Sequence, residues 1–177
     1  LITFAKAVTS GYIPLGGVMV GDRVAKVLIE QGGEFNHGYT YSGHPVACAV
    51  ALANLDVMEQ EGLVERVRTE TGPYLAQVFA QLGEHPLVGQ AETCGMMGAL
   101  LLLKNKTTGE VFPEGVDVGM MCRTHCFDNG LIMRAVGNRM IVAPPLIMRS
   151  ADIDELAQRI KLVLDKTLEQ LRATGQI

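Results

Sequence analysis

The chain has 177 residues, of which 48% are hydrophobic and 19% are charged, and its formal net charge is −4. These values exclude a disordered chain and predict a buried core. We expect no nucleic-acid partner, because no run of basic residues occurs, and no membrane span, because no apolar stretch is long enough. The four cysteines are spread along the chain, which favours reduced thiols and a cytoplasmic protein.

The first residues predict a buried strand that carries a lysine. Leu1, Ile2, Phe4 and Val8 are its apolar residues, and a period of two places Lys6 on the face of Ile2, Phe4 and Val8. Two interpretations of Lys6 are open: its side chain extends to water from the strand end, or its amine is kept partly dry because it must react. Because the chain begins inside an apolar strand, we expect it to be the C-terminal part of a longer protein.

A second short strand at 17–21 and a helix at 22–31 precede a polar and aromatic loop. A long helix follows from Pro45, and its first half is apolar nearly all round, which predicts burial on all sides. The loop before this helix suits an anion, because helix N-termini offer free N–H groups. Thr40 is a candidate hydroxyl donor to a phosphate, whereas Ser42 is expected to cap the helix.

The second half of the chain predicts a small α+β unit. A pair of residues, Gly72-Pro73, is expected to kink its first helix, and Gly137-Asn138 is expected to form the turn of a β-hairpin. The predicted elements are, in order, a helix at 63–83, two strands within 87–105, a helix at 116–130, a hairpin at 131–145 and a helix from Ser150.

Two further features of this half invite a functional interpretation. Arg134 lies in an apolar strand on the face of Ile132, so it either pairs with a carboxylate of the protein or a ligand, or lies in water on an edge strand. Cys122, His125 and Cys126 lie close together on one predicted helix. Zinc needs three or four ligands and no fourth is at hand, so we expect buried cysteines and no metal site.

Three stretches of the sequence resemble one family. ITFAKAVTSGYIPLGG, FNHGYTYSGHPVACAVALANL and CFDNGLIMRAVGNRMIVAPPL resemble the C-terminal part of class III aminotransferases, the ω-transaminases of the fold-type-I pyridoxal phosphate enzymes. Among these, the sequence is most similar to the putrescine or polyamine:pyruvate aminotransferases. The resemblance implies an α/β fold, in which residues 1–61 end the large cofactor domain and residues 62–177 form the small α+β C-terminal domain.

The resemblance also implies roles for individual residues. Lys6 would attach pyridoxal 5'-phosphate through its amine and then transfer the proton in the reaction. Thr40, together with Tyr39, would bind the cofactor, with Thr40 on the phosphate of the neighbouring subunit, so that a homodimer shares its active sites. Arg134 would pair with the carboxylate of the amino acceptor and swing away when an amine without a carboxylate enters.

We therefore expect an aminotransferase that moves an amino group from a primary amine, such as putrescine or a polyamine, to pyruvate. The alternatives are another class III enzyme, namely an ω-amino-acid aminotransferase or an aminomutase, and a truncated, non-catalytic dimerisation fragment. Other cofactor-binding parts of the family precede these stretches, so we expect the site to need further residues. The sequence leaves open which amine is the donor and whether dimers pair into tetramers.

Overall fold

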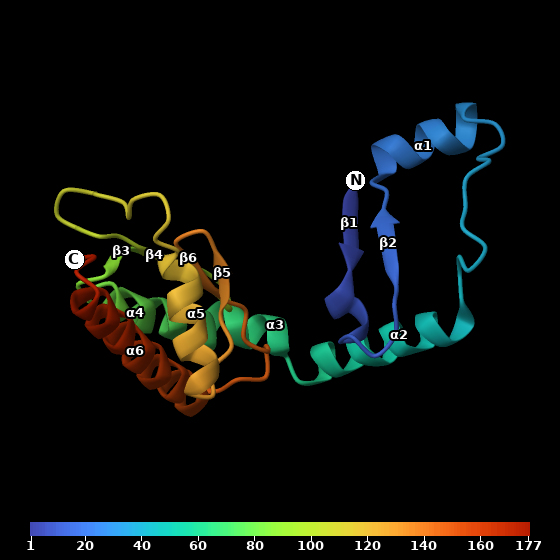
Figure 1. The fold of residues 1–177 in the computed structure, drawn as a ribbon. Coiled ribbons are helices and arrows are strands. Elements are labelled where there is room, and N and C mark those ends of the chain that lie inside the picture. Colours follow the sequence, from blue (N-terminus) through green and yellow to red (C-terminus); the bar gives the residue numbers. More distant parts are fainter. The chain divides into compact units, whose positions relative to one another are not determined.

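The computed structural model describes residues 1–177, which form two compact units, Leu1–Gly62 and Leu63–Ile177 (Figure 1). Each unit contains helices and strands, and each is described by itself below. The division adjoins the boundary that the sequence predicts at residues 61 and 62. The assignment of these units to a large cofactor domain and a small C-terminal domain stays a prediction. No helix of the structure has the length and apolar character that a bilayer span requires.

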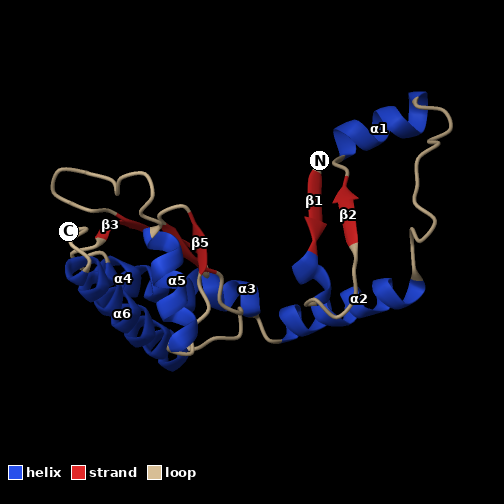
Figure 2. Ribbon diagram, viewed as in Figure 1, coloured by secondary structure: helices blue, strands red, loops and turns tan.

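The first unit is built around a two-stranded antiparallel ribbon of β1 (Ile2–Ala5) and β2 (Gly16–Met19). A short 3-10 helix, η1 (Lys6–Thr9), follows β1 directly, and the helices α1 (Asp22–Gln31) and α2 (Pro45–Gln60) follow β2 (Figure 2). Phe4 lies opposite Gly17 in the ribbon. A Cβ at residue 17 would lie 2.4 Å from Phe4 Cζ, so a larger residue there would displace this ring.

The first strand differs from its prediction in both length and burial. β1 ends at Ala5, and Lys6 therefore begins η1 instead of sharing a strand face with Ile2 and Phe4. Ile2 is 66% exposed and Phe4 39% exposed, because β1 pairs with β2 alone and no helix of the unit packs on the ribbon. The prediction of a buried strand that continues to Val8 is wrong. Alternation along the sequence cannot detect that the backbone turns at Lys6.

Helix α2 is buried along one side only. Ala47 and Ala51 are 2% and 7% exposed, and they lie with Asn54 on the side that faces η1. Val46 and Leu52 are exposed at 57% and 63%. The prediction that the first half of this helix is buried on all sides is therefore wrong for this chain, because η1 is the one element that packs against it.

The second unit begins with a helix that contains one π-helical turn. α3 (Leu63–Arg66), the π turn η2 (Val67–Thr71) and α4 (Gly72–Leu82) follow one another without a break. The N–H of Gly72 donates to the carbonyl of Val67, five residues earlier. A π turn inserts an extra residue into the helix and is a recognised way to accommodate a proline such as Pro73. The irregularity that the sequence predicts at Gly72-Pro73 thus takes this form.

The sheet of the second unit has four antiparallel strands in the order β3-β4-β6-β5. The apolar core lies on one side of the sheet and includes side chains of helices α4, α5 and α6. Of these helices, α4 and α5 contact the strands directly. Leu100 and Leu102 are fully buried under these helices, whereas Met97 on the same strand is 57% exposed. The strands and the remaining helices of this unit are β3 (Val88–Cys94), β4 (Met97–Leu102), α5 (Val118–Asp128), β5 (Arg134–Val136), β6 (Arg139–Val142) and α6 (Ser150–Ala173).

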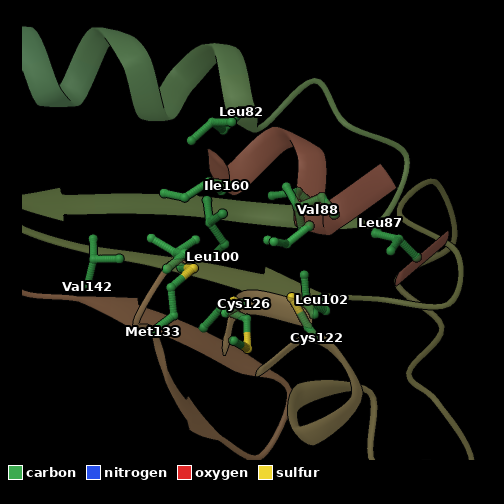
Figure 3. Close-up of a cluster of buried hydrophobic side chains, with 14 of the residues drawn as sticks. Leu82, Leu87, Val88, Leu100, Leu102, Cys122, Cys126, Met133, Val142 and Ile160 are labelled. Carbon is green, nitrogen blue, oxygen red and sulfur yellow. The ribbon is translucent and has the colours of Figure 1, made fainter. Parts of the chain in front are cut away.

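The core of this unit is one cluster of apolar side chains from the sheet and the helices. Figure 3 shows Leu100 and Val142 from the sheet close to Met133, with the sulfur atoms of Cys122 and Cys126 in the same cluster. Burial of a full leucine or methionine side chain contributes about 1.5–3 kcal/mol, so this cluster accounts for the stability of the second unit. The helices and strands here agree with the predicted α+β unit.

His85 is one of the few polar residues that are buried in the second unit. It lies in the loop after α4, is 9% exposed, and its Nδ1 accepts from the N–H of Leu87 at 3.2 Å. Its Nε2 lies 3.3 Å from Asp165 Oδ1 on α6. Burial lowers the pKa of His85 below its usual value and outweighs the opposite effect of Asp165. His85 is therefore a neutral side chain that joins the loop to α6.

Candidate functional site

Lys6 has a backbone conformation that residues with a side chain rarely adopt. Its φ is +54°, in the left-handed region, and Ser10 at the other end of η1 has a φ of +48°. This region costs a residue with a Cβ about 1 kcal/mol or more, so it persists only where surrounding contacts hold it. Such residues are enriched at active sites and ligand sites. We refer to Lys6–Ser10 as the Lys6 turn.

Two side chains hold the Lys6 turn in place. Thr9, 1% exposed, donates from Oγ1 to the carbonyl of Ile13 at 2.6 Å, and the same oxygen lies 3.3 Å from the carbonyl of Lys6. The second side chain is Asn54 of α2, which hydrogen-bonds to Ala7, Val8 and Ser10 of the turn. The turn is thus fixed both to the following loop and to the helix.

The amine of Lys6 is free to meet a ligand. The side chain is exposed, and its Nζ makes no hydrogen bond and no ion pair. Beside it lies an open hollow of about 550 Å³, lined by Lys6, Thr9 and the apolar part of segment 11–16. The predicted surroundings of Lys6 were the side chains of one strand face; the observed surroundings are a turn and a loop. An unpaired primary amine next to an apolar hollow is suited to react with a carbonyl group.

Thr40 opens a turn that leads into α2. Within this turn the N–H of Tyr39 donates to Ser42 Oγ at 3.0 Å, and the N–H of Ser42 donates to the carbonyl of Tyr39 at 2.9 Å. Ser42 is therefore occupied locally and does not cap the helix. His44 is the N-cap, since its Nδ1 accepts from the N–H of Ala47 at 3.4 Å. The hydroxyl of Thr40 has no partner in the chain.

Tyr39 lies beside Thr40 and is 79% exposed. Its ring contacts that of His37 edge-on, with 5.6 Å between centroids, and His37 contacts Phe35 in the same way at 5.8 Å. No hydrogen bond joins Lys6 to Tyr39 or Thr40 within the chain. The loop thus presents aromatic rings and the unpaired hydroxyl of Thr40, and it does so apart from the hollow beside Lys6, whose lining it does not enter.

Arg134 is the first residue of β5, which is an edge strand of the sheet. It is exposed, as is Ile132 at 79%, whereas Leu131 and Met133 are buried. This alternation agrees with the face that the sequence predicts. No carboxylate of the chain pairs with its guanidinium, which rules out the buried ion pair considered above. Arg134 is available to a carboxylate from outside the chain.

The cysteine and histidine group on α5 is structural. Cys122 and Cys126 are both fully buried, and the hydrogen bond with Cys122, with burial, raises the pKa of the Cys126 thiol. His125 instead lies on the surface, where its Nε2 is 2.7 Å from Gln170 Oε1. No three His, Cys, Asp or Glu side chains converge as metal ligands anywhere in the structure. All four cysteines are free thiols.

Comparison with known proteins gives one consistent family. The family model described as aminotransferase class-III matches residues 1–164. The putrescine–pyruvate aminotransferase of Pseudomonas aeruginosa is 54% identical over 167 residues, which cover 94% of this chain and 36% of that protein. The diaminobutyrate–2-oxoglutarate transaminase of Halomonas elongata is 40% identical over 183 residues, which cover 100% of this chain and 39% of that protein.

A solved structure shows the same fold. The PMP-bound form of an aminotransferase from Vibrio fluvialis superposes with a TM-score of 0.87 at 36% sequence identity, over 94% of this chain and 37% of that one. The chain therefore spans less than two-fifths of the length of these relatives. Within that span, its helices and strands have the arrangement of an α/β transaminase.

Proposed function

The chain belongs to the class III aminotransferase family, and on this premise we propose that the protein moves an amino group from a primary amine, such as putrescine or a polyamine, to pyruvate. The observation that carries the proposal is the free amine of Lys6, held on a left-handed turn beside an apolar hollow. The name of the Pseudomonas relative supports the choice of donor and acceptor.

The residues present fit pyridoxal phosphate, the cofactor of this family. Lys6 offers an amine without a partner, and Thr40 offers a hydroxyl without a partner in a turn that leads to a helix N-terminus. Lys6 would hold the cofactor, and Thr40 and Tyr39 would contact it. When bound, pyridoxal phosphate supplies an electron sink for the electrons of the bond that is broken at the substrate carbon.

Lys6 has a second proposed role when its amine is not attached to the cofactor. A primary amine can take up the proton from the donor carbon that bears the amino group and, in the second half-reaction, deliver a proton to the keto carbon of pyruvate. The amine of Lys6 makes no ion pair within the chain, so its Nζ is free to move. Hydrogen bonds fix the backbone of the Lys6 turn, and this fixes the point from which the side chain of Lys6 extends.

Arg134 is proposed to select the amino acceptor. A guanidinium can bind the carboxylate of pyruvate through two parallel hydrogen bonds, and a diamine has no carboxylate to offer. Because Arg134 makes no hydrogen bond or ion pair on its edge strand, its side chain is free to move between the two substrates.

Thr40 is proposed to serve the cofactor of a second copy of the chain. In support, no hydrogen bond joins Thr40 or Tyr39 to Lys6 within one chain, although the resemblance assigns all three to cofactor binding. The protein would then be a homodimer with two shared sites. A cytoplasmic location also stays a proposal, and the four free thiols support it.

A panel of amino donors tests the proposed reaction. Full-length protein is incubated with pyridoxal phosphate, pyruvate and one donor at a time, and alanine is measured. We expect alanine from putrescine and longer polyamines. A second candidate, an ω-amino-acid or diaminobutyrate transaminase, is favoured by the name of the Halomonas relative. It predicts product from amino acids only, and with 2-oxoglutarate as acceptor. If no donor gives turnover with either acceptor, the result favours the non-catalytic alternative.

A further inference from the structure

Asn54 is the one side chain of helix α2 that hydrogen-bonds outside its own helix, and all of these bonds go to the Lys6 turn. We infer that Asn54 is a positioning residue, which holds the backbone of the Lys6 turn so that the Lys6 amine meets the cofactor. The inference rests on the proposed role of Lys6. It adds a residue that touches neither the cofactor nor the substrate.

The three hydrogen bonds to the turn involve both Nδ2 and Oδ1 of Asn54, and Nδ2 also lies 3.8 Å from Met58 Sδ in the same helix. Its Nδ2 donates to the carbonyls of Ala7 at 3.1 Å and Val8 at 3.2 Å, and its Oδ1 accepts from Ser10 Oγ at 2.7 Å. An amide nitrogen has two hydrogens, so both donations are possible at once. The amide thus binds the two residues that follow Lys6 and the residue that ends the turn.

Apolar packing alone would hold the turn weakly. The buried residues of α2 are Ala47 and Ala51, whose side chains are single methyl groups. Methyl groups fill space but do not fix the rotation of peptide groups, whereas hydrogen bonds to two successive carbonyls do. Lys6 and Ser10, at the two ends, are also the only non-glycine residues of the chain with positive φ. The bonds from Asn54 therefore act on the segment whose conformation most needs support.

A change at Asn54 should consequently act on Lys6 through the backbone. Without the amide, the carbonyls of Ala7 and Val8 turn to water, and the turn exchanges between conformations in which the Lys6 amine points elsewhere. A fraction of the protein is then unable to bind the cofactor, and the apparent affinity falls by that fraction. We expect about a tenfold loss, the lower end of what two or three hydrogen bonds contribute, because the bonds of Asn54 are exposed or only partly buried.

The test compares three variants of the full-length protein. Asn54→Ala removes the amide, and Asn54→Asp keeps shape and acceptor but loses both donors. Gln60→Ala is the control, since it removes an exposed amide side chain without hydrogen bonds from the same helix. The first measurement is amide hydrogen exchange of the peptide that covers Lys6–Tyr12, without cofactor. We expect roughly tenfold faster exchange in Asn54→Ala and Asn54→Asp, and unchanged exchange in Gln60→Ala.

The second measurement follows attachment of the cofactor itself. Protein is titrated with pyridoxal phosphate, reduced with borohydride and digested, and the modified Lys6 peptide is quantified by mass spectrometry. Relative to the unaltered protein, half-modification of Lys6 should need about tenfold more cofactor in both Asn54 variants. Gln60→Ala should need the same amount as the unaltered protein. If Asn54→Ala fails to fold, Ser10→Ala removes the bond to Oδ1 alone and should give a smaller shift in the same direction.

The outcomes separate this inference from the proposed function. If Lys6 is not modified in the unaltered protein, the proposed function is wrong, whatever the Asn54 variants do. If Lys6 is modified and both Asn54 variants match the unaltered protein in exchange and in half-modification, the inference is wrong. A shift in Asn54→Ala but not in Asn54→Asp would also overturn it, because packing rather than donation would then be the cause.

Discussion

Arg134 lies directly opposite Ile141 on the antiparallel pair β5–β6, and no carboxylate of the chain approaches its guanidinium. The same cross-strand row continues through Ala99 to Glu92 on the far edge of the sheet. The arginine thus has an apolar neighbour and no ionic partner. A free guanidinium in such a position is suited to bind an anionic ligand.

Removal of this guanidinium should affect one substrate and spare the other. In Arg134→Ala, we expect the KM for pyruvate to rise by roughly 10- to 100-fold, the loss of a charge-assisted pair, with the KM for the diamine little changed. Steady-state kinetics with each substrate varied in turn give both values. Arg139→Ala is the matched control, because Arg139 is exposed on the neighbouring strand and also unpaired. An equal rise for pyruvate and diamine would contradict the assigned role.

Sharing of the active site can be tested by mixing two inactive variants. Lys6→Ala lacks the amine, and Thr40→Asp places a negative charge where we propose a phosphate binds. If each site takes Lys6 from one subunit and Thr40 from the other, every mixed dimer has one intact site. Random re-association at equal amounts should restore about a quarter of the activity. Sites made within one chain would give no recovery, and neither variant alone should recover after the same treatment.

The buried histidine predicts a pH dependence of stability. The folded chain lowers the pKa of His85, so the unfolded chain binds a proton more readily, near the ordinary value of 6.5. The free energy of unfolding should therefore fall as the pH is lowered through 6.5, and level off below the folded pKa. The groups that act on His85 are Asp165, Lys161 and Lys106. The pKa of Asp165 is also lowered, chiefly by Lys161. This group changes the free energy of unfolding only below about pH 3.8, the ordinary pKa of an aspartate.

Urea unfolding of His85→Asn isolates this contribution. Asparagine retains an acceptor for the N–H of Leu87 and does not titrate. The variant should lose less stability than the unaltered protein between pH 7 and pH 5.5, because the two proteins differ only at residue 85. Parallel stability curves for the two proteins across this range would show that His85 does not bind its proton on unfolding.

The two sides of β4 should respond differently to the same truncation. Leu100→Ala removes a fully buried side chain and should lower the free energy of unfolding by about 2–5 kcal/mol. Met97→Ala, on the same strand but 57% exposed, should cost well under half of that. Denaturant unfolding of both variants measures the difference. Equal costs would mean that the exposed side of the sheet is covered in the full-length protein.

The sequence predicted the second unit well, because periodic hydrophobicity determines its elements. Ile153, Ile160 and Leu164 recur at helical spacing in α6 and are all buried. The hairpin turn lies where Gly137-Asn138 predicts it, with φ of +54° at Gly137. Two of the errors in the first unit, the buried strand and the helix buried all round, concern burial and have one cause. Hydrophobic composition shows what a segment is able to bury but not which neighbours cover it.

The candidate site was predictable residue by residue but not in its geometry. Lys6, Tyr39, Thr40 and Arg134 were singled out by residue type and family resemblance, and their roles stay proposals. The left-handed turn at Lys6 depends on Asn54, which is distant in the sequence, and no local pattern could have indicated it.

The N-cap of α2 could have been predicted from the sequence, whereas the contact of His85 with Asp165 could not. The helix cap was open to prediction, since Pro45 at the first helical position makes His44, not Ser42, the N-cap. The contact of His85 with Asp165 joins a loop to the final helix, and nothing in the sequence indicates it.

Borohydride reduction of the loaded protein tests whether the amine of Lys6 holds the cofactor. Full-length protein with pyridoxal phosphate is reduced with borohydride, and every lysine-containing peptide is examined for the added pyridoxyl group. We expect the group on Lys6 at one per chain, and none in Lys6→Arg, which keeps the charge but lacks the reactive amine. Modification at another lysine, or full turnover by Lys6→Arg, would contradict the account.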